Sequence, residues 1–193
     1  MRMNLDTGHV EERVRLGDSP TYVIFLEKQK LLAVSLALSQ SVVLLDAETL
    51  ASVGAIDTGN RPEGMMVLNN KLLYIAESGG NSVLVYDLER NRIWKRIPVD
   101  FSPRRILGAD GFIYVSNYGS KSISLLRPGQ LGVSRSISLS GAPLELAHVS
   151  TSRWIYVGNE GNNSISIVDP VTSRVVNHIQ LGSRPGGIAV INR

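Results

Sequence analysis

The sequence predicts an all-β protein built from a repeat of 40 to 42 residues, and two regularly spaced features support this prediction. A tyrosine followed by valine or isoleucine recurs before a polar hairpin, at Tyr74, Tyr114 and Tyr156, with a weaker copy at Ala33. Prolines recur in step, separated by 42, 41, 40 and 42 residues, at Pro20, Pro62, Pro103, Pro143 and Pro185. Proline fixes its own φ angle, so each repeat begins at the same kind of turn. This period, with four short β-type runs in each repeat, is typical of a β-propeller of four-stranded antiparallel blades.

Each repeat supplies its four strands in the same order. An inner strand follows the proline, as in residues 22–26 and 65–68, and the second strand carries the tyrosine step. A third strand ends in an aspartate at Asp46, Asp87 and Asp169, and a polar outer strand follows, as in residues 93–97 and 175–179. The second strand is apolar almost throughout, as residues 72–75 show, whereas a strand with one wet face would alternate. We therefore expect it to lie between neighbouring blades.

The repeats divide one domain, residues 1–193, into four complete blades at residues 18–59, 60–100, 101–141 and 142–183. Residues 1–17 and 184–193 remain, and together they predict a split partial blade, which gives about five blades. Asp6 lies 40 residues before Asp46, so residues 1–6 are aligned with a third strand, residues 10–16 with an outer strand and residues 185–191 with an inner strand. That blade lacks its second strand. We therefore expect a longer propeller, a start further upstream, or a homo-oligomer that closes the ring with a second copy.

At these motifs the chain resembles the YVTN β-propeller repeat proteins, named for a Tyr-Val-Thr-Asn step in the equivalent strand. Residues 162–169 read Asn-Asn-Ser-Ile-Ser-Ile-Val-Asp, and residues 182–190 contain the Gly-x-x-Pro-x-Gly-Ile-Ala-Val pattern. The first repeat departs by lacking the tyrosine and asparagine, and Arg127 replaces the aspartate in the third repeat. NHL-type propellers share the period and are the second choice. The resemblance implies an extracytoplasmic protein of the periplasm or cell surface, whereas residues 1–17 are polar and charged and do not read as a signal peptide. Two expectations stay open: a targeting segment further upstream, or a family member that stays in the cytoplasm.

Composition excludes several function classes. Cysteine is absent, which removes disulfides, thiolate metal sites and cysteine nucleophiles. The formal net charge is +3, and the basic residues are spread along outer strands without interleaved aromatic residues, a pattern that does not favour nucleic acid as a partner. The longest apolar run, residues 31–38, is too short for a membrane span.

The proline turns and the hairpin turns after the tyrosine strands are expected on one face of the ring, because two antiparallel strands separate them in each blade. Loops on a rigid scaffold commonly carry binding sites. The candidate ligand-binding residues on this face are Arg61, Glu63, Arg104, Arg105, Glu145, Arg184, Glu77, Tyr118 and Glu160. We expect a protein or small-molecule ligand to bind there, with the arginines as the strongest contacts.

No catalytic residue, resident cofactor or metal site is predicted, because the chain carries no nucleophile elbow, phosphate loop or EF-hand loop. Two alternatives remain open. The first is a non-enzymatic binding scaffold. The second is a metal-assisted enzyme similar to the lactonases and lyases that share the propeller architecture, for which only Glu63, Glu145 and His148 offer ligands.

Overall fold

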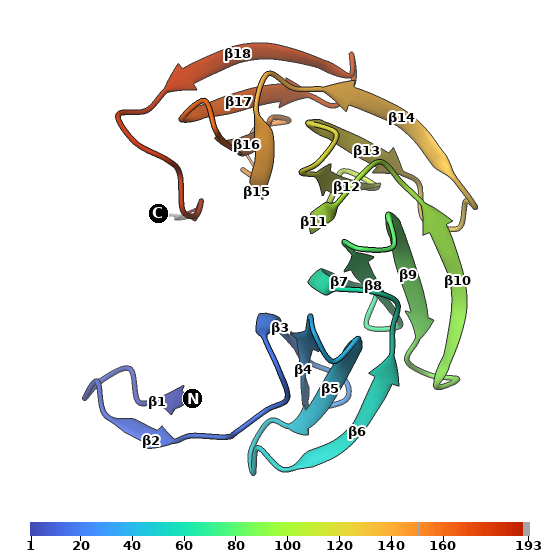
Figure 1. Ribbon diagram of the computed structural model, residues 1–193, viewed down its shortest axis with the longest axis vertical. Coiled ribbons are helices and arrows are strands. Elements are labelled where there is room, and N and C mark those ends of the chain that lie inside the picture. Colours follow the sequence, from blue (N-terminus) through green and yellow to red (C-terminus); the bar gives the residue numbers. More distant parts are fainter. Residues whose placement is uncertain (150, 191–193) are drawn as a thin grey trace.

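The computed structural model describes residues 1–149 and 151–190, and this part of the chain contains strands and turns but no helix. The strands form four antiparallel sheets of four strands and one sheet of two strands (Figure 1). The predicted all-β propeller of four-stranded blades is confirmed. Within these residues, no helix is long and apolar enough to cross a membrane.

Each complete blade is one sheet whose strands follow chain order from the centre of the arc outward. Blade 1 consists of β3 (Pro20–Leu26), β4 (Leu31–Leu36), β5 (Ser41–Asp46) and β6 (Ser52–Asp57). Blade 2 consists of β7 (Pro62–Leu68), β8 (Leu72–Glu77), β9 (Ser82–Asp87) and β10 (Arg92–Pro98). Blade 3 consists of β11 (Pro103–Ala109), β12 (Phe112–Asn117), β13 (Ser122–Leu126) and β14 (Val133–Ser138). Blade 4 consists of β15 (Ala142–His148), β16 (Ile155–Glu160), β17 (Ser164–Asp169) and β18 (Arg174–Gln180).

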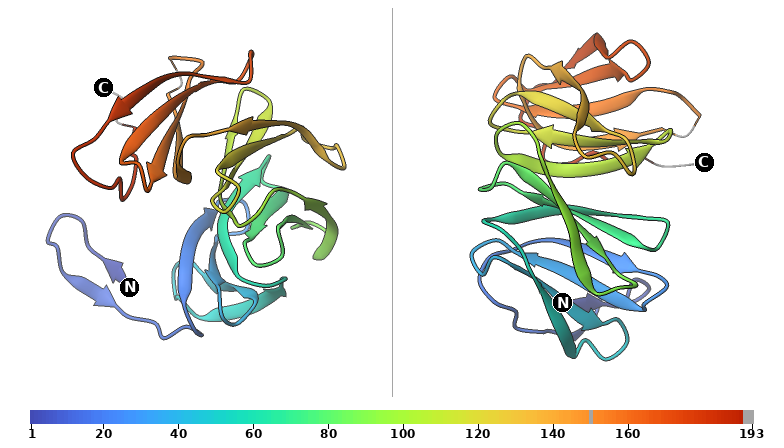
Figure 2. Two further views of the ribbon diagram at one scale, coloured as in Figure 1. Left: turned by 45° about the horizontal axis from the view of Figure 1, so that its top comes forward. Right: turned by 90° about the vertical axis from the view of Figure 1, so that its right-hand side faces the viewer.

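The blades stand side by side along an open arc, as the edge-on view in Figure 2 shows. The inner strands β3, β7, β11 and β15 surround the centre of the arc, and β6, β10, β14 and β18 form its rim. A small two-stranded sheet, β1 (Arg2–Met3) with β2 (Val10–Glu12), lies at one end of the arc, and the C-terminal segment lies at the other (Figure 1).

The hydrophobic core is divided among the interfaces between successive blades. Between blades 1 and 2, Leu26 and Val42 pack with Met65 and Ile75. Similar clusters join blades 2 and 3 and blades 3 and 4. The second strands β8 and β12 are buried along almost their whole length, as the continuous apolar pattern predicted, because a neighbouring blade covers each face.

The two-stranded sheet corrects the predicted alignment of the N-terminal residues. Asn4, and not Asp6, takes the place of Asp46: its side chain accepts hydrogen bonds from the amides of Asp6 and Thr7, just as Asp46 accepts from Glu48 and Thr49. The pairing is also equivalent, since Arg2 opposes Glu12 as Leu44 opposes Gly54, with a bulge at the next residue in both sheets. The N-terminal copy is therefore 42 residues from the next one, and β1 and β2 are a third and a fourth strand.

The inner strand expected over residues 185–191 does not form: residues 181–190 make no strand pairing, and Ile191 lies outside the described residues. Pro185 and Ile188 instead pack against β16, within 3.4 to 3.5 Å of the position that a Cβ on Gly158 would occupy. A strand requires a partner for its backbone N–H and C=O groups, and none lies beside this segment in the described structure. The joining of the two chain ends in one blade therefore stays a prediction.

Candidate ligand-binding face

The proline turns and the hairpin turns pack against each other, which confirms that they share one face of the arc, the upper face. In blade 2 the amide of Ser78 donates to the carbonyl of Arg61, and in blade 3 the amide of Tyr118 donates to the carbonyl of Ser102, both at 2.9 Å. Because the two turns of each blade are joined through the backbone, their side chains are presented from a fixed platform.

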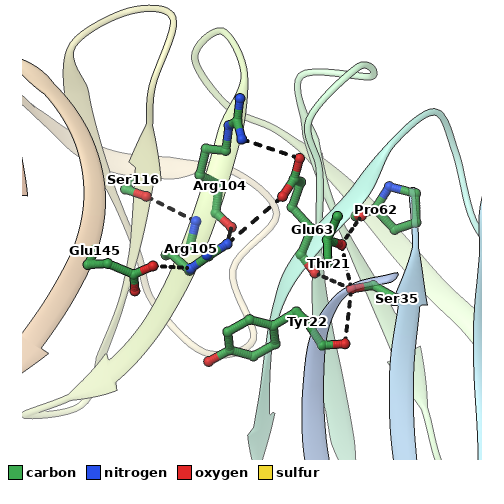
Figure 3. Close-up of polar contacts among 9 residues, drawn as sticks. All are labelled: Thr21, Tyr22, Ser35, Pro62, Glu63, Arg104, Arg105, Ser116 and Glu145. Atoms are coloured by element: carbon green, nitrogen blue, oxygen red, sulfur yellow. Dashed lines mark hydrogen bonds and ion pairs between the residues drawn. The ribbon is translucent and has the colours of Figure 1, made fainter. Parts of the chain in front are cut away.

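Arg105 is the centre of a charged cluster on this face (Figure 3). Its Nε donates to Oε1 of Glu145 in blade 4 at 2.9 Å, and its Nη1 lies 3.9 Å from Oε2 of Glu63 in blade 2. Its guanidinium also lies over the ring of Tyr22 in blade 1, 5.2 Å from the centroid. One side chain therefore connects blade 3 to the other three complete blades.

Gly64 makes room for this arrangement. The residue two positions after the proline is Tyr22 in blade 1, Gly64 in blade 2, Arg105 in blade 3 and Glu145 in blade 4. A Cβ on Gly64 would lie 2.6 Å from the carbonyl oxygen of Arg104 and 3.0 Å from the Cα of Arg105, closer than real Cβ contacts allow. The missing side chain in blade 2 lets Arg105 reach across that blade to Tyr22.

A second group of predicted residues continues the cluster toward blade 4. Arg104 contacts Glu63 at 3.5 Å and lies over the ring of Tyr118, 4.9 Å from its centroid. A hydrogen bond with Glu160 raises the pKa of Tyr118, and Glu160 pairs with Arg184 at 2.8 Å. The structure thus brings together seven of the nine residues proposed from sequence: Glu63, Arg104, Arg105, Tyr118, Glu145, Glu160 and Arg184.

The other two candidates lie apart from this cluster. Glu77 is 1% exposed, and its carboxylate accepts hydrogen bonds from the amide of Gly59 and the hydroxyl of Ser82, both at 2.6 Å, and pairs with Arg96. Glu77 thus links β8 to β9, to β10 and to the segment that enters blade 2. Asn117 at the equivalent position in blade 3 links β12 to β13 through Ser122 and Ser124. Arg61 is exposed in the proline turn of blade 2, with a left-handed φ of 55°.

Two charged pairs of the upper face, Arg184–Glu160 and Arg104–Glu63, are asymmetric, with the arginine more exposed than the carboxylate, whereas the Arg105 and Glu145 side chains are 19% and 24% exposed. The Arg184 side chain is 61% exposed and that of Glu160 is 21% exposed, whereas Arg104 and Glu63 are 29% and 5% exposed. Burial of a carboxylate requires such pairing. These two pairs therefore expose more guanidinium than carboxylate to solvent, and the exposed side chains of Leu38 and Phe101 add apolar area to the same face.

Sequence reasoning missed Tyr22 and Gly64 as parts of the cluster. Both occupy the column two residues after the proline, which also holds Arg105 and Glu145. This shared position in the repeat is the one sequence feature that links the four residues. They differ in chemistry, so a comparison of the repeats by residue type does not detect it.

The residues of the metal alternative are not gathered into one site. Glu63 and Glu145 both face Arg105, while His148 lies at the far end of β15, where its Nε2 is 3.4 Å from Oδ2 of Asp110. Glu145 and His148 are three positions apart on one strand, so their Cα atoms are separated by about 10 Å. Among residues 1–149 and 151–190, no group of three or more histidine, aspartate or glutamate side chains is placed to hold a metal ion.

Comparison with known proteins supports the fold. No family model matches the chain, and no curated protein matches its sequence. Among solved structures, the chain is similar to hydrazine synthase of Kuenenia stuttgartiensis, with 23% identity and a TM-score of 0.76 over 89% of this chain and 52% of that one. A functionally unknown protein of Desulfotomaculum acetoxidans matches with 15% identity and a TM-score of 0.75, over 92% of this chain and 61% of that one.

The β-propeller domain of Cps50 (Swd1) from Myceliophteria thermophila matches with 13% identity and a TM-score of 0.75, over 91% of this chain and 59% of that one. The chain therefore spans about half to three fifths of the length of these structures. At such low identity the likeness concerns the fold alone, and a propeller hosts many unrelated functions. What the comparisons support is a β-propeller scaffold.

Proposed function

We propose that the chain is a non-enzymatic β-propeller scaffold, similar to the YVTN repeat proteins, that binds an acidic segment of a partner protein through its upper face. The observation that carries this proposal is the asymmetry of the charged pairs. Arg104 and Arg184 are each more exposed than the glutamate with which they pair, and Arg104 lies over the ring of Tyr118. Arginine and aromatic residues dominate the binding energy of many protein interfaces.

Rigidity favours the same surface. Arg105, Glu63 and Glu145 hold the inner ends of blades 2, 3 and 4 together, so the outer arginines stand on a platform that needs little ordering on binding. Arginine also presents a planar donor fork that suits carboxylates. An acidic peptide with one or two apolar residues would match the exposed arginines together with Leu38 and Phe101.

The test uses a fluorescently labelled Glu-rich peptide that contains one leucine, with a Lys-rich peptide of the same length as the reference ligand. Neutralising Arg61 and Arg184 in a double variant, R61Q and R184Q, should weaken binding of the acidic peptide at least about tenfold, because two charge-assisted contacts are lost. Binding should also weaken as salt rises.

Arg90 and Arg153 provide a matched control on the opposite face. Each pairs with a buried aspartate and is about as exposed as Arg184. The double variant R90Q and R153Q removes the same charge, so it should leave the affinity unchanged. An equal loss in both double variants would mean that the peptide senses only overall charge, and it would overturn the proposed face.

A further inference from the structure

The rim of blade 2 exposes a tryptophan at an irregular position of its outer strand. In β10, Ile93 pairs with Tyr86 and Lys95 pairs with Val85, so Trp94 is the extra residue of a β-bulge and has no partner on β9. A bulge re-aims a side chain away from the regular faces of a sheet. Trp94 is 42% exposed, and the Nζ of Lys95 lies over its ring, 4.3 Å from the centroid. The indole is therefore presented to solvent beside a cation.

The turn between β13 and β14 adds exposed apolar side chains to this part of the rim. Figure 1 shows the turn at the outer edge of the arc beside β10, and the Nζ of Lys95 donates to the carbonyl oxygen of Gln130 in the turn. The next residue, Leu131, is 77% exposed, and Val133 at the start of β14 is 39% exposed. Lys95 thus connects the two segments that carry the exposed side chains of Trp94 and Leu131.

These two segments, residues 92–99 and 127–138, form the rim patch, which is basic and contains no acidic residue. Within the described part of the chain, only one of its cations forms an ion pair, that of Arg96 with the buried Glu77. The segment of blade 1 equivalent to residues 127–138 is residues 46–57, which contain three acidic side chains and no basic one. The cations of the rim patch are Arg92, Lys95, Arg96, Arg127 and Arg135.

The acidic side chains nearest to the rim patch in sequence already have partners. Asp87 pairs with Arg90, and Glu89 pairs with Lys28 and Lys71. Asp100 accepts hydrogen bonds from the hydroxyls of Ser122 and Ser136. The positive charge of the patch is therefore available to an anionic surface.

We propose that the rim patch binds the surface of an anionic lipid membrane, with Trp94 and Leu131 inserted at the level of the headgroups. Tryptophan suits this interface because its ring is apolar while its N–H can still find a hydrogen-bond partner. Arginine and lysine beside an anionic leaflet add electrostatic affinity. The two apolar side chains stand on an outer strand and a turn, so a deformable lipid surface can receive them without a matching pocket. The patch is separate from the arginine-rich upper face, so the inference goes beyond the proposed function.

The first test compares two kinds of vesicle in a flotation assay with the full 193-residue chain. One kind is an equal mixture of phosphatidylcholine and phosphatidylglycerol, and the other is phosphatidylcholine alone. The chain should bind the anionic vesicles at least about tenfold more tightly, because several cations lie in the patch. Binding to the anionic vesicles should weaken as salt rises.

Fluorescence then reports whether Trp94 itself enters the lipid. The chain contains two tryptophans, so in a Trp154→Phe variant the emission comes from Trp94 alone. Addition of anionic vesicles should shift this emission to shorter wavelength, and lipids with brominated acyl chains should quench it. Neither change should occur with phosphatidylcholine alone.

Matched variants separate the apolar contribution from a general effect of surface polarity. The double variant Trp94→Ser and Leu131→Ser should weaken vesicle binding at least about tenfold, because the apolar area that enters the interface is lost. The control is Val53→Ser with Val176→Ser. These valines are the bulge residues of β6 and β18 and are 56% and 48% exposed, so their replacement should leave vesicle binding unchanged.

A second pair of variants tests the charges. The double variant R92Q and R135Q should weaken binding to anionic vesicles about tenfold or more, and R92Q alone should weaken it about fivefold. The double variant R61Q and R184Q removes the same charge from the upper face and should leave vesicle binding unchanged. Thermal melts establish that each variant is folded, and R92Q alone keeps the test valid if loss of the Arg135 contacts with blade 4 destabilises the chain.

Several results would overturn the proposal. Equal affinity for the two kinds of vesicle, or no binding to either, would exclude recognition of anionic lipid. An equal loss in the two arginine double variants would mean that the vesicles sense only overall charge, and an unshifted Trp94 emission would exclude insertion. Binding of an acidic leucine-containing peptide that is lost in the Trp94→Ser and Leu131→Ser variant, without vesicle binding, would assign the rim patch to a partner protein instead.

Discussion

The inner strands of blades 1 and 2 differ greatly in burial although their sequences follow the same pattern. Val23 and Met65 both lie three residues after the proline of their repeat, yet Val23 is 58% exposed and Met65 is 1% exposed. The difference comes from the neighbour: β3 and β4 cover Met65, whereas the sheet beside Val23 contains only β1 and β2. Burial in a propeller is thus a property of the interface between blades and not of the blade alone.

Repeat proteins gain stability from their units and from the interfaces between neighbouring units. In this chain three interfaces are filled and the flank of blade 1 is open. Substitutions at matched positions should therefore have unequal effects at filled and open interfaces. Two such pairs and one buried tyrosine test this comparison.

The largest difference is expected for a buried charge. Val157 is fully buried between blades 3 and 4, so Val157→Asp should lower the free energy of unfolding by about 4 kcal/mol or more, because the carboxylate has no partner there. Val23→Asp on the open flank should change it by less than about 0.5 kcal/mol. Urea denaturation followed by circular dichroism measures both. Similar losses at the two positions would show that the flank is covered in solution.

A smaller difference is expected for an added methyl group at two glycines of one column. Gly64 and Gly187 each lie two residues after a proline, but only Gly64 has backbone atoms of the next blade against it. Gly64→Ala should cost about 1 to 3 kcal/mol, because Arg104 and Arg105 must move away. Gly187→Ala has nothing within 4 Å and should leave the melting temperature nearly unchanged. A harmless Gly64→Ala would contradict the close approach of blades 2 and 3.

The smallest effect concerns alkaline pH. Burial between blades 3 and 4, with a contribution from Asp110, raises the pKa of Tyr114 to about 12. The unfolded chain releases this proton near pH 10 and the folded chain does not, so stability is full below pH 10 and falls as pH rises from about 10 to 12. Tyr114→Phe should make the alkaline decline shallower in thermal melts.

An alkaline decline in Tyr114→Phe identical to that of the unmodified chain would contradict the burial of this hydroxyl between blades 3 and 4.

The register error at the N-terminus shows the limit of motif matching in a repeat whose length varies. Asp6 matches the other turn aspartates by residue type, but it is Asn4 whose side chain accepts hydrogen bonds from the amides two and three residues ahead. Asparagine and aspartate can both form such a turn. The repeat length varies from 40 to 42 residues, so residue type alone cannot decide between two candidate positions that are two residues apart. The hydrogen bonds of the folded turn identify Asn4 as the equivalent position.

The C-terminal segment shows a different limit. Residues 182–190 carry the motif that precedes and includes an inner strand, but the described part of the segment forms none. A proline turn and apolar residues favour an extended conformation locally, but a strand forms only where a neighbouring strand supplies hydrogen-bond partners for its backbone. The motif therefore indicates where a strand can form and does not by itself produce one.

The sequence by itself determined the repeat, the order of the four strands in each blade and the face on which the proline and hairpin turns meet, because these depend on local turn chemistry and on alternation of strand direction. Only the tertiary structure decided which side chains on that face touch. Arg105 reaches Tyr22, 83 residues earlier in the chain, because Gly64 leaves a gap in the blade between them. This contact depends on how strongly the whole arc is curved and on the absence of a side chain at Gly64. Neither property can be read from a local sequence pattern.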